Sequence, residues 1–218
     1  MVAAHSAGQT SLNTAIEFGN RLLTFPLAAI AALTFIACLR YQPSGRRRLD
    51  LVWLSAALPG GVIAQAAAGG LVVITPLKPV MVATHFLLSS AILADAVVLH
   101  TRAGESPGPV RPLVRADLRV LARLLAAAIA LMLAAGTVVT GTGPLAGTII
   151  DSHGRRATVP RFRFPLRDVT QLHADIGWFI GALAVALAIG LHFTRASART
   201  VRTSRARRLP QGIRKLSV

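Results

Sequence analysis

The sequence predicts an all-α integral membrane protein of about five transmembrane helices. Of its 218 residues, 53% are hydrophobic and only 15% are charged, and the mean hydropathy is +0.58. A soluble domain carries about a quarter charged residues, so this chain has too few charges for that class. Its apolar residues follow one another in long runs without the alternation of a strand, which indicates helices long enough to cross a membrane.

Five apolar runs define the organisation of the chain. Each can cross a hydrocarbon core of about 30 Å as a helix that rises about 1.5 Å per residue. The runs lie at about residues 18–39, 51–74, 80–100, 120–141 and 170–193. We therefore expect an extracytoplasmic N-terminus at 1–16, a transmembrane helical domain at 17–194 and a basic cytoplasmic tail at 195–218. The tail lacks apolar periodicity, which predicts a disordered extension that touches anionic lipid headgroups.

The net charge of +16 results from 24 Lys and Arg residues against 8 Asp and Glu residues. Such an excess is typical of nucleic-acid-binding proteins. Aromatic residues, however, make up only 5% of the chain, too few for base-stacking surfaces. The basic residues instead gather in 40–48, in 102–119 and in the tail, which the positive-inside rule places in the cytoplasm. We therefore expect no nucleic-acid partner, an N-terminus outside and a C-terminus in the cytoplasm.

One connecting segment, 142–169, is expected on the extracytoplasmic side although it carries five arginines. Its glycines and prolines predict an ordered loop with little regular structure. The single cysteine, Cys38, lies within the first run, so we expect no internal disulfide and no cysteine-based metal site. Residues 1–13 lack a basic region followed by an apolar core, so the first run itself is expected to act as the insertion signal.

The stretch Ala15–Thr24 places a carboxylate, an amide and a guanidinium at the start of the first run. On a helix Glu17 and Arg21 are four residues apart, share a face and can pair, with Asn20 beside them. Charged groups at the edge of a membrane are costly, so such a cluster is a candidate functional site. An ion pair that only anchors a helix end explains it equally well, and both interpretations stay open.

Polar side chains inside the other runs fall at a similar depth in the outer half of the membrane. They are Gln65 ahead of Gly69 and Gly70, His85, Thr137 with Thr140, and His173. This convergence predicts one or two shared cavities. Membrane histidines on different helices with glycines nearby are suited to haem, because imidazole supplies the axial bond and an arginine can pair with the propionates. The alternative is that each histidine makes an interhelical hydrogen bond.

Two carboxylates lie within or beside these runs. Asp95 is placed toward the cytoplasmic end of the third run, where we expect it to meet an arginine. Asp175, two residues after His173, is expected to face the cavity or interfacial water.

At these residues the sequence resembles the haem A synthase family in its actinobacterial form. Five pieces match in collinear order: Ile16–Thr24, Gln65-Ala66-x-x-Gly69-Gly70, Val82–Ser89, Gly136–Pro144 and Gln171–Asp175. The resemblance implies a pseudo-twofold bundle of eight helices, of which the five runs form an incomplete version. It also implies a plasma-membrane oxidoreductase that converts the methyl group of haem O to the formyl group of haem A for cytochrome oxidase, with haem b as cofactor.

The resemblance assigns roles to individual residues. Glu17 would be the catalytic carboxylate near the reacting methyl group, and His85 and His173 would bind iron as axial ligands in the first and second halves. The remaining candidates for cofactor binding are Asn20, Arg21, Gln65, Gly69 and Gly70. Haem O synthase and cytochrome oxidase assembly proteins are the implied partners, besides membrane lipid and a second copy of the chain.

The chain also departs from the family pattern. It is shortened at both ends, without a match to the first helix and the last two helices. Asn20 stands where many members have the partner of His85, and Gly143–Thr148 lacks the histidine of the usual Gly-Pro-His-Ala-Gly-Asp. A catalytically inactive assembly factor, or a fragment of a longer haem A synthase, is therefore the alternative. A small transporter would need discontinuous helices, for which the sequence offers little beyond Gly69 and Gly70.

Overall fold

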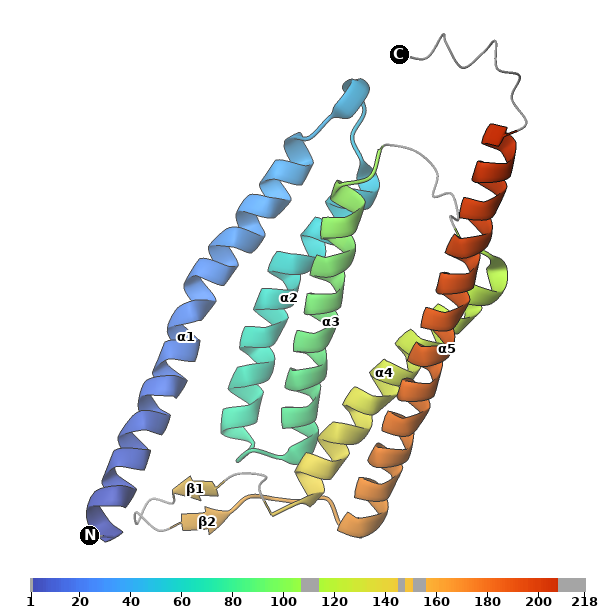
Figure 1. The fold of residues 1–218 in the computed structure, drawn as a ribbon. Helices are drawn as coiled ribbons and strands as arrows, with labels where there is room; N and C mark the ends of the chain where they lie inside the picture. Colours follow the sequence, from blue (N-terminus) through green and yellow to red (C-terminus); the bar gives the residue numbers. More distant parts are fainter. Residues whose placement is uncertain (1, 107–113, 145–147, 151–155, 208–218) are drawn as a thin grey trace. The chain divides into compact units, whose positions relative to one another are not determined.

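The computed structural model describes residues 2–106, 114–144, 148–150 and 156–207. The side chains of 2–14, Glu17, Ser44, 148–150, 156–157 and 195–207 lie outside the description. The elements are α1 (Val2–Arg40), the short 3₁₀ helix η1 (Pro43–Gly45), α2 (Leu49–Ile74), α3 (Pro79–Ala103), α4 (Ala116–Thr142), β1 (Thr148–Ile150), β2 (Arg156–Thr158) and α5 (Leu166–Arg207), as drawn in Figure 1.

Five helices of the described chain are long and apolar enough to cross a membrane, which confirms the predicted fold class. Their spans are Phe18–Arg40, Leu49–Ile74, Pro79–Ala103, Ala116–Thr142 and Leu166–Thr194. Each span includes one predicted run and exceeds it by up to four residues at an end, because polar residues there continue the helical hydrogen bonding.

The chain divides into two compact units. Unit 1 comprises Met1–Pro109 and Thr140–Phe162, and unit 2 comprises Val110–Val139 and Arg163–Val218. Helix α4 therefore belongs to unit 2 except for its last three residues, which pack with unit 1. Each unit is a set of antiparallel helices with its own small core.

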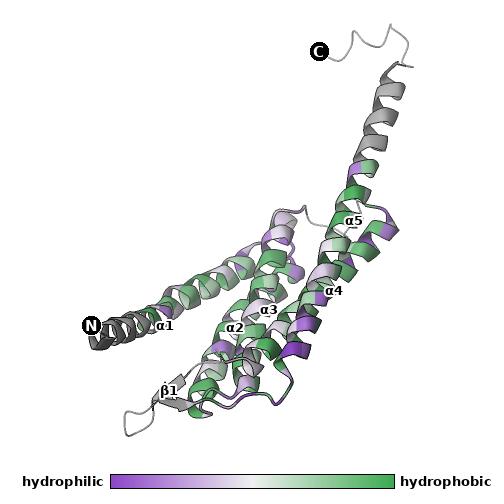
Figure 2. Ribbon diagram, turned by 60° about the horizontal axis from the view of Figure 1, so that its bottom comes forward, coloured by the Kyte–Doolittle hydropathy of each residue, from purple (hydrophilic) through white to green (hydrophobic). Residues whose placement is uncertain are grey.

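In unit 1, α2 packs against both α1 and α3. Small residues bring these helices close: Ser55 has no exposed surface, and a methyl group on Gly61 would lie 2.7 Å from the Ile92 side chain of α3. Large apolar side chains face outward instead, and Trp53 is 75% exposed. Figure 2 shows this apolar colouring along the helices. An apolar outer surface over a small-residue interior is what lipid-embedded helices require.

Unit 2 is an antiparallel pair of helices. A methyl group on Gly177 of α5 would lie 3.4 Å from Met132 of α4, and one on Gly190 would meet the end of the Leu118 side chain. Glycines on α5 thus accept the larger side chains of α4, which holds the two backbones close over most of their length.

A network of hydrogen bonds around Arg48 joins α2 to α3 at one end of unit 1. At one end, Arg48 is only 9% exposed and donates hydrogen bonds to Asp50 (2.8 Å) and to the carbonyls of Arg102 (3.0 Å) and Glu105 (2.7 Å). The side chain thereby ties the start of α2 to the last turn of α3 and to the residues that follow this helix. The hydrogen-bonded carboxylate of Asp50 raises the pKa of the Arg48 guanidinium.

The segment 142–169 contains one short hairpin between the end of α4 and the start of α5, which agrees with the prediction of an ordered loop with little regular structure. Strands β1 and β2 pair antiparallel, with Thr148 opposite Thr158, Ile149 opposite Ala157 and Ile150 opposite Arg156. The β-branched residues of β1 favour the extended conformation. The hairpin lies at the end of unit 1 where α3 begins (Figure 1).

The basic tail is helical as far as Arg207, so the predicted disorder was wrong for 195–207. Residues 208–218 lie outside the described part. Alanine and arginine are good helix formers, and extending an existing helix avoids the cost of nucleation. At the other end of the chain, α1 already begins at Val2, so that 2–16 continue the first transmembrane helix instead of preceding it.

Candidate functional site

The ring of His85 packs directly on a glycine of the neighbouring helix. His85 lies on α3, six residues after Pro79, which is a depth of about 9 Å along the helix. A methyl group on Gly69 of α2 would lie 3.3 Å from Cε1 and 3.9 Å from Nδ1 of this ring. Nδ1 is buried and has no hydrogen-bond partner among the described residues. Any side chain larger than hydrogen at position 69 would therefore push the imidazole.

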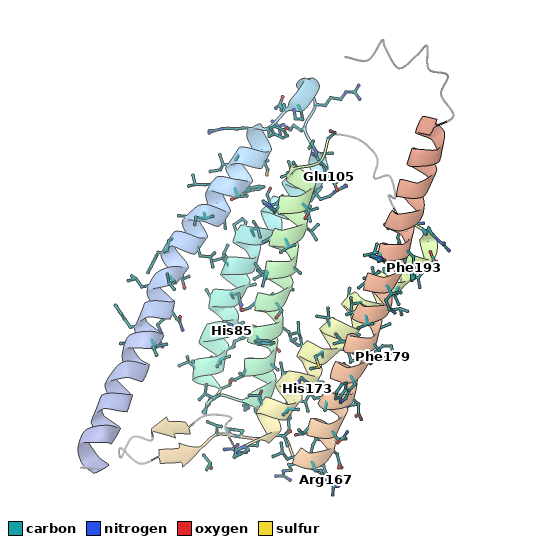
Figure 3. The ribbon with its side chains drawn as sticks, in the orientation of Figure 1. His85, Glu105, Arg167, His173, Phe179 and Phe193 are labelled. Carbon is teal, nitrogen blue, oxygen red and sulfur yellow. The ribbon has the colours of Figure 1, made fainter. Side chains whose placement is uncertain are left out.

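Unit 2 contains the same arrangement. His173 lies on α5, seven residues after Leu166, at a helical depth of about 10 Å. A methyl group on Gly136 of α4 would lie 3.2 Å from Cε1 and 3.7 Å from Nδ1. Its Nδ1 is likewise buried without a partner in the described part of the chain. Figure 3 labels both histidines on their helices, each toward the end at which its helix begins.

In both units Cε1 is the imidazole atom nearest to the position that a methyl group on the glycine would take. For His85 the two ring nitrogens are almost equally distant from it, Nδ1 at 3.9 Å and Nε2 at 4.0 Å. For His173 the Nε2 atom is not among those within 4 Å of the position that a methyl group on Gly136 would take. A neutral imidazole binds a metal through either Nε2 or Nδ1, so both histidines carry the atoms that such a bond requires.

Gln65 ties α2 to the turn of α3 that carries His85. Its Nε2 donates to Oγ of Ser89, and that hydroxyl donates to the backbone carbonyl of His85 (3.2 Å). Gln65 precedes Gly69 by four residues, so both lie on the same face of α2. Its Oε1 is buried without a partner among the described residues. The structure thus brings together three of the predicted site residues, Gln65, Gly69 and His85.

The two adjacent glycines of α2 differ in their surroundings. A methyl group on Gly70 would meet nothing within 4 Å, whereas one on Gly69 would meet the imidazole. We expected both glycines to make room for a porphyrin. The structure shows that Gly69 makes room for the histidine ring.

The predicted cluster at the start of the first run is described only in part. Asn20 and Arg21 are exposed on α1, and the side chain of Glu17 lies outside the description. The role of these three residues in a site stays a prediction.

The polar residues Asp95 and Asp175 differ in their partners. Asp95 was expected to meet an arginine, but its Oδ2 is buried without a partner among the described residues. The nearby Arg102 pairs instead with Glu105 (2.9 Å) and Asp50 (3.6 Å), which lie closer to the end of the helix. Asp175 is exposed and accepts a hydrogen bond from Gln171 (2.8 Å).

Beside His173, α4 and α5 form an open apolar groove of about 420 Å³. It is lined by Leu124, Ala127, Ala128, Leu131, Asp175, Ile176 and Phe179. Asp175 is the one charged residue of this lining. His173 and the other polar residues predicted at this depth are not part of the lining, so the prediction that Asp175 faces their shared cavity stays a prediction. Thr137, which we expected at the same depth, donates to the carbonyl of Ala134 in its own helix (2.7 Å).

Two features of the site were not predicted as site residues. Gly136 lies against the ring of His173; it begins the matching piece Gly136–Pro144, but the sequence analysis gave it no role in the site. Arg161 is half-buried with its NH1 atom unpaired among the described residues, in a segment whose arginines were treated together.

The described residues can offer a metal one imidazole ligand at a time, but not a complete set of side-chain ligands. No group of three or more His, Cys, Asp or Glu side chains there could hold a metal ion. Haem requires only one or two protein ligands because the macrocycle supplies the other four nitrogens. The buried and unpaired Nδ1 atoms and the glycine seats are compatible with imidazoles held ready for such a bond.

Comparison with known proteins gives one match. The family model described as cytochrome oxidase assembly protein, COX15-CtaA, matches residues 3–212. Neither the curated proteins nor the solved structures contain a significant match. Because the family model covers nearly all of the sequence, the chain belongs to the COX15-CtaA family of cytochrome oxidase assembly proteins, the haem A synthase family.

Proposed function

We propose that the protein is a haem A synthase-type oxidoreductase of the plasma membrane. It converts the methyl group of haem O to the formyl group of haem A for cytochrome oxidase, with haem b as cofactor. One observation carries the proposal within this family: each unit seats one imidazole on a glycine of the adjacent helix and buries its Nδ1 without a partner.

The residues present fit a haem in each unit. His85 and His173 would each supply one axial nitrogen, and the haem would supply the capacity to oxidise a carbon–hydrogen bond. The pair of hydrogen bonds from Gln65 through Ser89 to the His85 carbonyl would hold that turn of α3 in place. Arg21 and Asn20 would contact the porphyrin from α1, with the guanidinium paired to a propionate.

Glu17 is proposed as the catalytic carboxylate beside the reacting methyl group. A carboxylate there can hold or accept a proton, and it can also stabilise positive charge that develops on the substrate. Arg21, four residues later on the same helix, would keep it ionised in the resting state.

The second candidate function is a non-catalytic assembly factor, or a part of a longer enzyme. It is favoured by Asn20, which stands in place of an imidazole, and by the single seated histidine in each unit of the described chain. A second axial nitrogen would then come from another chain. Haem O synthase, a cytochrome oxidase assembly protein or a second copy of this chain are the proposed partners.

Haem binding and complementation separate these functions. The protein is purified from membranes supplied with haem, and its Soret absorbance is measured for the wild type, His85→Ala and His173→Ala. The exposed His100 and His192 provide matched control substitutions. We expect each site variant to lose one haem and each control to lose none. Absence of haem from the wild type would refute the enzyme, and haem binding without rescue of a haem A synthase deletion would favour the assembly factor.

A further inference from the structure

Among the described residues, the guanidinium of Arg161 has a hydrogen-bond acceptor for one terminal nitrogen and none for the other. Its NH2 atom donates to the carbonyl of Pro144 (3.0 Å), whereas NH1 is buried and has no partner among the described residues. A guanidinium carries five N–H donors and keeps its charge at any physiological pH. Burying one of these donors without an acceptor is costly, so the position calls for an acceptor that carries negative charge.

The segment that carries Arg161 is fixed to the helices of unit 1. The N–H of Phe162 donates to the carbonyl of Gly141 at the end of α4 (2.9 Å). A methyl group on Gly141 would lie 2.8 Å from both the Phe162 ring and Cβ of Pro79 at the start of α3. This close contact requires glycine at 141 and fixes the backbone beside Arg161 against the start of α3. A donor that is already positioned loses little entropy when it binds a ligand.

No carboxylate of the described residues neutralises this arginine. The described parts of the segment 140–162 contain no Asp or Glu, and the carboxylates of Asp50 and Glu105 are engaged with Arg48 and Arg102 at the other end of unit 1. The ligand therefore has to bring an oxyanion, either a carboxylate or a phosphate. Arginine binds both groups with two parallel hydrogen bonds.

The depth of His85 along α3 indicates whether the bound oxyanion is a carboxylate or a phosphate. Pro79, against which the Arg161 segment packs through Gly141, lies six residues and about 9 Å before His85 on the same helix. A porphyrin is an amphiphile whose carboxylates share one edge. If His85 holds its iron inside the membrane, that edge can reach the start of α3, against which the segment of Arg161 packs through Gly141.

We propose that Arg161 is an oxyanion-binding residue that takes the carboxylates of the porphyrin held by His85. The inference rests on the proposed function, because it needs a haem in unit 1. A phospholipid phosphate is the other source of the same chemistry, and the experiment distinguishes the two.

The test compares haem b with its dimethyl ester, which lacks the carboxylates. Both are titrated by Soret absorbance into wild type, Arg161→Gln and Arg161→Lys in detergent without phospholipid. To isolate the haem of unit 1, all proteins carry His173→Ala. Arg163→Gln is the matched control, because Arg163 is exposed two residues away in the same segment.

We expect the wild-type background to bind haem b about ten-fold or more tightly than the ester, as the loss of a charge-assisted hydrogen bond implies. Arg161→Gln should lower this preference about ten-fold and leave only the part that Arg21 supports, Arg161→Lys should lower it less, and Arg163→Gln should leave it unchanged. Equal binding of haem b and the ester by the wild-type background would overturn the inference and leave haem binding intact. If the wild-type background binds neither haem b nor the ester, the proposed function is refuted as well.

The phosphate alternative has its own readout. Phosphatidylglycerol that co-purifies with the protein is quantified by mass spectrometry for Arg161→Gln and Arg163→Gln. If Arg161→Gln loses bound phosphatidylglycerol while its preference for haem b over the ester is unchanged, the ligand is a lipid phosphate and the porphyrin assignment is overturned.

Discussion

The close approach of His85 to Gly69 and of His173 to Gly136 leads to a quantitative prediction. Alanine at either position adds a methyl group 3.3 Å or 3.2 Å from Cε1 of the imidazole. Ordinary contacts of this kind are 3.4–4 Å, so the ring or the helix has to move by a few tenths of an ångström. The displaced atoms include Nε2, and a shift of an axial ligand by its supporting shell typically costs about 10- to 100-fold in metal affinity.

The same substitutions are expected to leave the folded protein nearly as stable as the wild type. Alanine in place of glycine favours a helix by up to about 1 kcal/mol. Overpacking costs about 1–3 kcal/mol, and the lower value applies here because the overlap is small. The two effects offset each other, so haem affinity and thermal stability should separate.

The assay is a Soret titration of the haem-free protein, with the thermal unfolding midpoint measured on the same samples. Gly60→Ala and Gly181→Ala are the controls, because a methyl group on either glycine would meet nothing within 4 Å. We expect Gly69→Ala to weaken the haem at His85 and Gly136→Ala the haem at His173. Wild-type haem affinity in both variants would show that the glycine seats do not orient the ligands, and the reasoning would be wrong.

Three further outcomes are expected. Glu17→Gln should abolish formation of haem A, measured by pyridine haemochrome spectra, while haem content is unchanged; loss of the protein from the membrane would instead identify an ion pair with Arg21. Arg48→Ala should lower the free energy of unfolding by about 2 kcal/mol, because the carbonyls of Arg102 and Glu105 and the carboxylate of Asp50 each lose a hydrogen bond to a charged donor, whereas the exposed Arg47→Ala should change it little in thermal melts. Asp95→Asn should leave stability unchanged or raise it by up to about 2 kcal/mol, since the carboxylate has a buried oxygen without a partner among the described residues; a destabilised variant would reveal a partner.

Hydropathy and motif order were sufficient to predict the five spans and the family. Transfer of an apolar run into lipid depends on the residues of that run alone, so each span could be placed without knowledge of its neighbours. The motifs around Glu17, His85 and His173 lie on three different spans, and their order is a property of the chain. The tail was predicted less well, and the hairpin within 142–169 was not predicted, because helix propagation past Thr194 and pairing of β1 with β2 depend on structure already formed nearby.

The register between helices was decided by tertiary structure. Nothing in the sequence distinguishes Gly69 from Gly70, yet only Gly69 faces an imidazole, and Gly136 gained its role because α4 and α5 align it with His173. The same holds for Arg161, whose hydrogen bond to Pro144 spans a hairpin, and for Asp95, which misses the arginine expected beside it. Which side chains meet depends on the rotation and offset of two packed helices, and these follow from the summed contacts of both surfaces rather than from either sequence run by itself.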